Sequence, residues 1–192
     1  MTEAEKMQAC LPYDSLDPTM QDLFHRTQQL LEQFNGLSCR QDAQRAALLE
    51  QLLGSVGKGA FIKGRFICTY GKHISLGDGV FINDDANFMD DNLITIGKNV
   101  LIGPGSLLIT ANHPLVYEQR VFTDEAGQRH AMSYSAPITI EEGAWLAARV
   151  TVCPGVTIGK GAVIGTGSVV TKDIPAGMLA VGTPCKPLRP VK

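Results

Sequence analysis

The sequence predicts a mainly β protein, a solenoid of stacked short strands with an N-terminal helical cap, and two observations carry this prediction. The first is the glycine content, 20 of 192 residues against few aromatic residues, which is typical of a chain that turns often. The second is a strict six-residue period of large aliphatic residues, at Ile140, Leu146, Val152, Ile158, Ile164 and Val170.

Each six-residue unit reads as a very short strand followed by a corner. In Val156-Thr157-Ile158 apolar and polar residues alternate as in a strand, and Gly159-Lys160-Gly161 then supplies a turn. Earlier runs repeat the unit, at Leu76, Ile82 and Phe88 and at Ile96, Ile102 and Leu108. One such coil cannot bury its own face, so we expect coil to stack on coil. A sandwich of short strands would not keep so long a strict period.

The first 55 residues have a helical character instead. Asp17-Pro18 is typical of a helix start, with Asp as the cap and Pro in the first turn, and Asn35-Gly36 is typical of its end. A second helix is expected from about 42 to 53. We therefore expect a helical cap over 1–55 and a β-helix with a C-terminal tail over 56–192, packed as one structural unit.

Two interruptions break the six-residue period. Eight residues separate Phe88 from Ile96, which predicts a bulged corner around Asp90 and Asp91. A longer break predicts an excursion from the solenoid over about 109–137. Because loops carried by a rigid scaffold often hold functional residues, these breaks are the first places to look for a site.

Composition and charge exclude several classes of partner. The formal net charge is −2 and no run of Lys or Arg stands out, so nucleic acid and anionic membrane are poor partners. No apolar run approaches the roughly 20 residues that span a bilayer, and no signal-peptide pattern is present, so we expect a cytoplasmic protein. The 5 cysteines are dispersed, which fits free thiols in a reducing compartment and argues against a zinc site.

The repeat resembles that of the hexapeptide-repeat acyltransferases. Ile96-Gly97, Ile102-Gly103, Ile158-Gly159 and Ile164-Gly165 match the repeat of that family as they stand. In the family the solenoid is a left-handed parallel β-helix and three chains form a trimer. The resemblance thus implies a left-handed parallel β-helix and a homotrimer with clefts between its subunits.

The whole chain resembles the maltose/galactoside O-acetyltransferase branch of that family, which includes the nodulation-type acetyltransferases. The helical cap, Thr95–Ile102, Asn112-His113-Pro114, Pro154–Gly159 and Gly182–Lys186 follow in the order of that branch. The resemblance implies transfer of an acetyl group from acetyl-CoA, the co-substrate, to a sugar hydroxyl, with no metal required.

His113 is the candidate general base. A sugar hydroxyl is a poor nucleophile near neutral pH, and a neutral imidazole can take its proton as it attacks. His113 opens the excursion and stands where the branch carries its catalytic His-Pro. The other histidines, His25, His73 and His130, match no motif position.

The acceptor-binding residues follow from the resemblance. Asp91 is expected to accept hydrogen bonds from the sugar hydroxyls, although a turn Asp bonded to its own backbone is the ordinary alternative. Thr69 stands where the family has a serine that contacts the acceptor. Asp17 is our candidate for the acceptor-binding Asp of the cap, and Asp14 competes with it.

The donor-binding positions that the resemblance implies are Asn83, Ala148, Thr166, Thr171, Lys172, Lys186 and Arg189. Coenzyme A carries phosphates, so the three cationic side chains are expected to meet them. Asn83 is expected in the catalytic cleft, where its amide can also steady an oxyanion. Trp145 is expected to line the cleft, to contact a neighbouring subunit or to pack in the core.

Three alternatives remain open. The acceptor can be a xenobiotic or an envelope sugar, because the long segment Tyr117–Met132 departs from relatives with shorter loops and leaves the sugar and the hydroxyl undecided. A γ-carbonic-anhydrase-like metal protein uses the same solenoid but needs three converging histidines. A trimeric scaffold without enzymatic activity is the third alternative.

Overall fold

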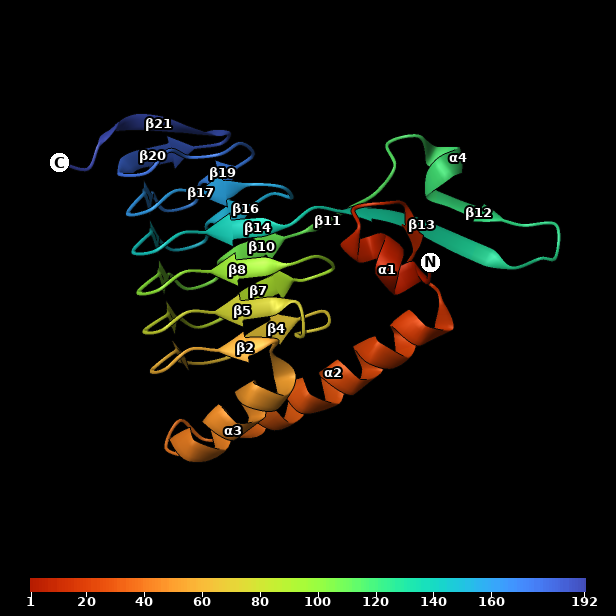
Figure 1. The fold of residues 1–192 in the computed structure, drawn as a ribbon, viewed down its shortest axis with the longest axis horizontal. Helices are drawn as coiled ribbons and strands as arrows, with labels where there is room; N and C mark the ends of the chain where they lie inside the picture. Colours follow the sequence, from red (N-terminus) through yellow and green to blue (C-terminus); the bar gives the residue numbers. More distant parts are fainter.

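The computed structural model describes residues 1–192 and shows a three-sided parallel β-helix, with helices at one end and a strand-rich excursion at its side (Figure 1). Each coil gives one strand to each face, in sequence order. The first face comprises β2 (Ser55–Val56), β5 (Ile74–Leu76), β8 (Ile94–Ile96), β14 (Ile138–Ile140) and β17 (Thr157–Ile158). The second comprises β3 (Phe61–Ile62), β6 (Phe81–Ile82), β9 (Leu101–Ile102), β15 (Trp145–Leu146), β18 (Val163–Ile164), β20 (Met178–Gly182) and β21 (Cys185–Pro190). The third comprises β4 (Phe66–Cys68), β7 (Ala86–Met89), β10 (Leu107–Ile109), β16 (Thr151–Val152) and β19 (Val169–Val170).

The six-residue period produces columns of stacked side chains inside the solenoid. On the second face Ile82 pairs with Ile102, which pairs with Leu146, and the column continues to Ile164. All four side chains are almost fully buried. Each interior side chain lies directly above its equivalent in the coil below. The six-residue repeat of the sequence therefore places an aliphatic residue at the same buried position of every coil. The prediction of a mainly β solenoid is confirmed.

Two of the three helices of the cap cover the N-terminal end of the solenoid, and the first lies beside the excursion (Figure 1). The three are α1 (Glu3–Gln8), α2 (Pro18–Gly36) and α3 (Asp42–Leu52). Asp17 caps α2, accepting the backbone N–H of Thr19 at 2.9 Å, as its Asp-Pro start predicts. The buried Arg45 of α3 joins the cap to the first coil, donating to the carbonyl oxygens of Phe34 and Ile62. None of the helices is long and apolar enough to cross a membrane.

The excursion has structure of its own. It contains β11 (Ala111–Asn112), the short helix α4 (Tyr117–Arg120), β12 (Val121–Thr123) and β13 (Arg129–Ser135). The long strand β13 pairs antiparallel with β11 and β12, and also with β1 (Tyr13–Asp14) from the cap. Segments far apart in the sequence thus lie side by side next to the solenoid (Figure 1).

The register breaks all fall on one edge, where the third face turns into the first. Leu76 pairs with Ile96, so this early coil has 20 residues. Ile140 pairs with Ile158, so this later coil has 18. The two extra residues enter the corner between β7 and β8, and the excursion leaves from the equivalent corner after β10. The bulged corner predicted at Asp90 and Asp91 is therefore confirmed, and it lies one coil below the excursion.

Glycine follows the buried aliphatic residue where two coils approach most closely. A Cβ atom at Gly97 would lie 2.6 Å from the amide nitrogen of Glu142 in the next coil. A Cβ atom at Gly103 would lie 2.5 Å from the carbonyl carbon of Ala147. The Ile-Gly pairs of the sequence are therefore required by close approach between coils.

Replacing Gly97 by alanine should lower the free energy of unfolding by about 1–3 kcal/mol, because the added methyl group forces two coils apart. Gly36 at the end of α2 is the matched control, since a Cβ atom there meets nothing within 4 Å. Thermal denaturation of the two variants measures the difference. Equal Tm values for Gly97→Ala and Gly36→Ala would contradict this account.

Candidate active site

A cavity of about 340 Å³ lies where the bulged corners, the cap and the excursion meet. The cap lines it with Ser15, Leu16, Gln21 and Phe24, the corners with Thr69, Tyr70, Met89 and Asp91, and the excursion with Ala111, His113 and Ser133. We call it the His113 cavity. It brings together three residues that the sequence predicts to act together, Thr69, Asp91 and His113.

The ring of His113 is held in one tautomer. Its Nδ1 lies 3.0 Å from the carbonyl oxygen of Met132, and the hydroxyl of Ser133 lies 3.2 Å from the same nitrogen. A carbonyl oxygen only accepts, so the hydrogen of the neutral ring resides on Nδ1. Nε2 therefore carries the lone pair and can take a proton.

Asp91 is buried at the cavity wall and has a specific partner. The phenol of Tyr13 donates to its Oδ1 at 2.7 Å, from β1 of the cap. Burial raises the pKa of the Asp91 carboxyl, and the hydrogen bond from Tyr13 acts against that rise. Burial and the charge of Asp91 raise the pKa of Tyr13 in turn, so the phenol stays a donor.

Asp90, the neighbour of Asp91, does not line the His113 cavity. The sequence did not suggest its part in the site. Asp90 is fully buried, and its Oδ1 accepts the backbone N–H groups of Thr69 and Tyr70, each at 2.9 Å. Burial raises the pKa of Asp90 to about 7. The backbone carbonyl of Asp90 also accepts a hydrogen bond from Nδ1 of His73 at 2.6 Å. Asp90 thereby sets the corner that carries Thr69 into the cavity.

Asp17 lies outside the His113 cavity of the single chain, and its contact with the acceptor stays a prediction. Its carboxylate caps α2 and faces a separate hollow of about 290 Å³, which Asp14 also lines. Neither residue lines the His113 cavity, where the cap instead contributes Ser15 and Leu16. The physical reason is that a helix-capping carboxylate must turn back toward its own backbone N–H groups. Tyr13 is the cap residue that reaches Asp91, and no motif in the sequence marks it.

Asn83 lies on a different edge of the solenoid from His113. It follows β6, at the corner between the second and third faces, and its Oδ1 accepts the N–H of Asp84 at 2.9 Å. Ala148 and Thr166 lie on the same edge in later coils, which the hydrogen bond from Gly167 N–H to the Ala148 carbonyl joins at 2.9 Å. The expectation that Asn83 shares a cleft with His113 is therefore not met within one chain.

The remaining predicted donor positions lie near the C-terminal end. Thr171 and Lys172 follow β19 on the edge that carries His113, and Lys186 and Arg189 lie on β21. All four residues are exposed. They form a polar surface with three cations.

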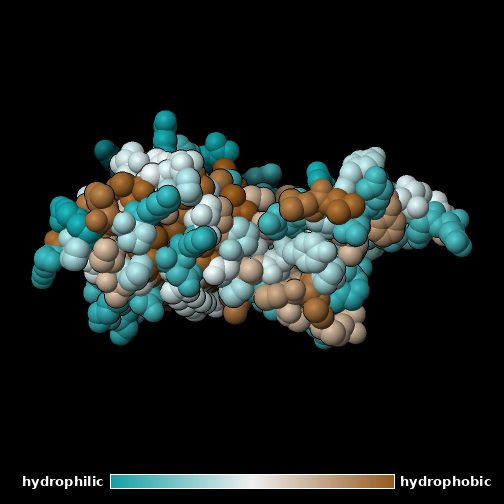
Figure 2. Space-filling view, turned by 90° about the horizontal axis from the view of Figure 1, so that it is seen from above, coloured by the Kyte–Doolittle hydropathy of each residue, from teal (hydrophilic) through white to brown (hydrophobic).

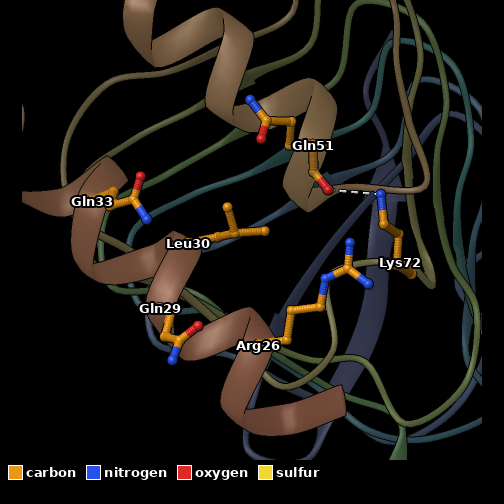
Figure 3. A pocket seen from close by; sticks show the side chains of 6 residues that line it. All are labelled: Arg26, Gln29, Leu30, Gln33, Gln51 and Lys72. Carbon is orange, nitrogen blue, oxygen red and sulfur yellow. Dashed lines mark hydrogen bonds between the residues drawn. The ribbon is translucent and has the colours of Figure 1, made fainter. Parts of the chain in front are cut away.

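A larger hollow, about 420 Å³, lies between α2 and α3 (Figure 3). It is lined by Arg26, Gln29, Leu30, Gln33, Gln51 and Lys72. Lys72 donates its Nζ to the carbonyl oxygens of Gln51 and Leu53 at 2.7 and 3.3 Å, and so caps the end of α3. Without a base or a nucleophile, this hollow is a poorer candidate for catalysis than the His113 cavity.

No group of three or more His, Cys, Asp or Glu side chains is gathered as a metal site within the chain. His73 bonds the Asp90 carbonyl, and His130 lies between the carboxylates of Asp14 and Asp124. His73, His113 and His130 thus each have hydrogen-bond partners of their own.

Two family models match the chain. The model described as "Bacterial transferase hexapeptide (six repeats)" matches residues 137–172, and "Maltose acetyltransferase hexapeptide capping motif" matches residues 6–57. The chain is 36% identical over 166 residues to the galactoside O-acetyltransferase of Escherichia coli K12, covering 86% of this chain and 78% of that relative.

Solved structures match over the full length. The maltose O-acetyltransferase from Clostridium difficile 630 aligns with a TM-score of 0.93 at 36% identity, covering 100% of this chain and 98% of that chain. A galactoside acetyltransferase in complex with coenzyme A aligns with a TM-score of 0.91 at 33% identity, covering 100% and 92%. These similarities cover the cap, the solenoid and the excursion together.

Replacing Tyr13 by phenylalanine should raise the pKa of Asp91 further and lower the free energy of unfolding by about 1–3 kcal/mol at pH 7. The reason is that the variant leaves a buried carboxylate without its phenol donor. Urea denaturation and an NMR titration of Asp91 measure the two effects. Tyr134→Phe is the control, because Tyr134 is an exposed tyrosine of β13. If both variants behave alike, the hydrogen bond between Tyr13 and Asp91 contributes nothing to the free energy of unfolding or to the pKa of Asp91.

Proposed function

The chain belongs to the hexapeptide-repeat acetyltransferases of the maltose and galactoside O-acetyltransferase type, and on this premise we propose that it moves an acetyl group from acetyl-CoA to a sugar hydroxyl with His113 as the base. The resemblance read from the motifs is thereby confirmed, as is the enzyme class. The observation that carries the role of His113 is its held tautomer, with Nε2 free in a cavity beside a buried carboxylate.

In the proposed reaction the sugar hydroxyl attacks the carbonyl carbon of the acetyl thioester while Nε2 of His113 takes the hydroxyl proton. The carbonyl π electrons move to oxygen in the tetrahedral intermediate. When they return, the carbon–sulfur bond breaks, and the thiolate of coenzyme A takes the proton from the imidazolium. The products are an O-acetyl sugar and free coenzyme A. The Met132 carbonyl also stabilises the imidazolium formed during the attack.

Asp91 is the proposed partner of the sugar hydroxyls. Its Oδ1 is bonded by Tyr13, so the second carboxylate oxygen is left to accept from the acceptor. Thr69 faces the same cavity from the coil below and adds a hydroxyl. A small cavity with a few convergent polar groups and the apolar walls of Phe24 and Met89 fits one sugar ring.

For the donor we propose the edge that carries Asn83, Ala148 and Thr166, with Thr171 of a neighbouring subunit's His113 edge facing it across the cleft. Backbone groups at such corners suit the amides of the pantetheine arm. The exposed cations Lys172, Lys186 and Arg189 suit its phosphates. One of the similar structures holds coenzyme A, which supports this donor.

We also propose a homotrimer, because the acceptor residues and this donor line lie on different edges of one chain. A neighbouring subunit can bring its Asn83 edge to the His113 edge, which completes the cleft. The outer side of the second face supports this assembly with an apolar stripe that runs coil to coil, through Phe61, Phe81, Leu101, Trp145, Val163 and Leu179. Trp145 is 49% exposed, so it does not belong to the core of one chain. The outer residues of the first face are serines and threonines instead.

Figure 2 views the molecule from the C-terminal end of the solenoid, and hydrophobic residues reach that surface between hydrophilic ones. The apolar stripe on the outer side of the second face is contiguous from coil to coil, and contiguous exposed apolar area is typical of an interface. The free state of all 5 cysteines fits the reducing cytoplasm, which we propose as the location.

Replacing His113 by alanine should lower kcat by about 10²–10⁴-fold, because the proton of the hydroxyl loses its base. Binding of acetyl-CoA should persist, since its proposed contacts lie elsewhere. A thiol-release assay with acetyl-CoA and a panel of glucosides, galactosides, maltose and chitooligosaccharides measures the loss of kcat and identifies the acceptor. His25→Ala is the control, because it removes an exposed imidazole from α2. A His113→Ala enzyme near the wild-type rate would refute the assignment.

Replacing Trp145 by glutamate should convert the trimer into monomers, because it places a charge in the middle of the apolar stripe. Light scattering coupled to size exclusion measures the mass, and circular dichroism checks that the solenoid persists. The matched control is Thr95→Glu, on the outer side of the first face. A trimer that survives Trp145→Glu would exclude this stripe as the interface.

A further inference from the structure

His130 lies in the long segment of the excursion, and both nitrogens of its ring are engaged. Nδ1 lies 2.7 Å from Oδ2 of Asp14 on β1, and Nε2 lies 3.1 Å from Oδ2 of Asp124 in the turn after β12. Carboxylate oxygens only accept, so both nitrogens must carry hydrogen for both bonds to exist. We call His130, Asp14 and Asp124 the His130 cluster.

The surroundings of the cluster leave these two carboxylates as its partners. The ring of Phe122 stacks on His130 with 5.0 Å between centroids. Glu3 and Lys6 of α1 and Asp17 face the same hollow, but Glu3 pairs with Lys6 and Asp17 caps α2. The hydrogen bonds that His130 donates to Asp124 and Asp14 raise the pKa of His130, which agrees with a charged ring.

The cluster lies beside the backbone that holds His113. In the pairing of β1 with β13, Asp14 is opposite Met132 and Tyr13 is opposite Ser133. The Oδ1 of Asp14 also accepts the backbone N–H of Ala131 at 3.0 Å. One strand pair therefore carries His130 and Asp14 of the cluster, the Met132 carbonyl that bonds His113, and the phenol that bonds Asp91.

We propose that His130 is a positioning residue for acetyl transfer: its cluster sets the place of β13, and hence of the Met132 carbonyl that keeps the hydrogen of His113 on Nδ1. When this carbonyl shifts, the hydrogen of the neutral His113 ring is free to move to Nε2. A ring with its hydrogen on Nε2 has its lone pair on Nδ1, so Nε2 has none to offer the sugar hydroxyl. This proposal rests on the role proposed above for His113.

The cluster should also make the activity of the site depend on pH. Because the pKa of His130 is raised, both of its bonds are present below that pKa, and one is lost as the pH rises through it. The wild-type kcat should therefore fall at alkaline pH with an apparent pKa above the ordinary histidine value. The variant His130→Gln lacks the charged ring and should lose this limb of the profile.

The experiment compares His130→Gln with wild type in two measurements. Nitrogen NMR of histidine-labelled protein reports which ring nitrogen of His113 carries hydrogen, and His113→Ala identifies the signal by its disappearance. We expect wild type to keep hydrogen on Nδ1 and His130→Gln to show a mixture. We also expect kcat to fall about ten-fold with both KM values within about three-fold, since a misplacement of about 1 Å costs up to about 10²-fold.

Asp124→Asn and Glu125→Gln form a matched pair on the same turn. The first removes a partner of His130 and should reproduce the NMR change in weaker form, and it replaces His130→Gln if that variant does not fold. Glu125 is exposed and is not a hydrogen-bond partner of His130, so its variant should match wild type. If His113 keeps its hydrogen on Nδ1, or kcat stays within two-fold, the proposal is overturned. Failure of the base assignment would show separately, as activity retained in His113→Ala.

Discussion

The register between successive coils is the constraint on which the rest of the molecule depends. Backbone hydrogen bonds hold neighbouring coils about 4.8 Å apart, so each interior side chain must lie directly on its equivalent in the next coil. Columns such as Ile82, Ile102 and Leu146 satisfy this requirement with large aliphatic groups. The same spacing excludes a Cβ atom at Gly97 and Gly103. A shift by one residue would turn the columns outward, which is why the period is strict.

A regular solenoid offers no place for chemistry, and the candidate site arises where the regularity fails. Extra residues enter the corner between the third and first faces in the early coils, and the excursion leaves from that corner after β10. Stacking brings Thr69 below Asp91 and Asp91 next to His113. The site therefore uses the register of the scaffold to align residues that are far apart in the chain.

Burying two adjacent carboxyl groups is costly, and each is bonded by a separate part of the protein, while Oδ2 of Asp90 stays buried without a hydrogen-bond partner. Asp90 accepts two backbone N–H groups of the coil below, and Asp91 accepts the phenol of Tyr13 from the cap. The cap thus does more than cover the end of the solenoid. Through β1 it stabilises the wall of the cavity and pairs with β13, the strand that holds His113.

The sequence by itself determined the solenoid, the cap helices and the positions of both register breaks, and it singled out His113 as the candidate base, because these follow from local periodicity and motif order. The partners of His113 and Asp91 were decided only by the tertiary structure. Tyr13, Asp90 and Met132 reach the site through strand pairing and corner geometry that no local pattern records. Asp17 was expected in the cavity and serves as a helix cap, since its local hydrogen bonds set its direction. Local sequence encodes which residues are buried and where the chain turns, but contacts between distant segments depend on how the turns stack.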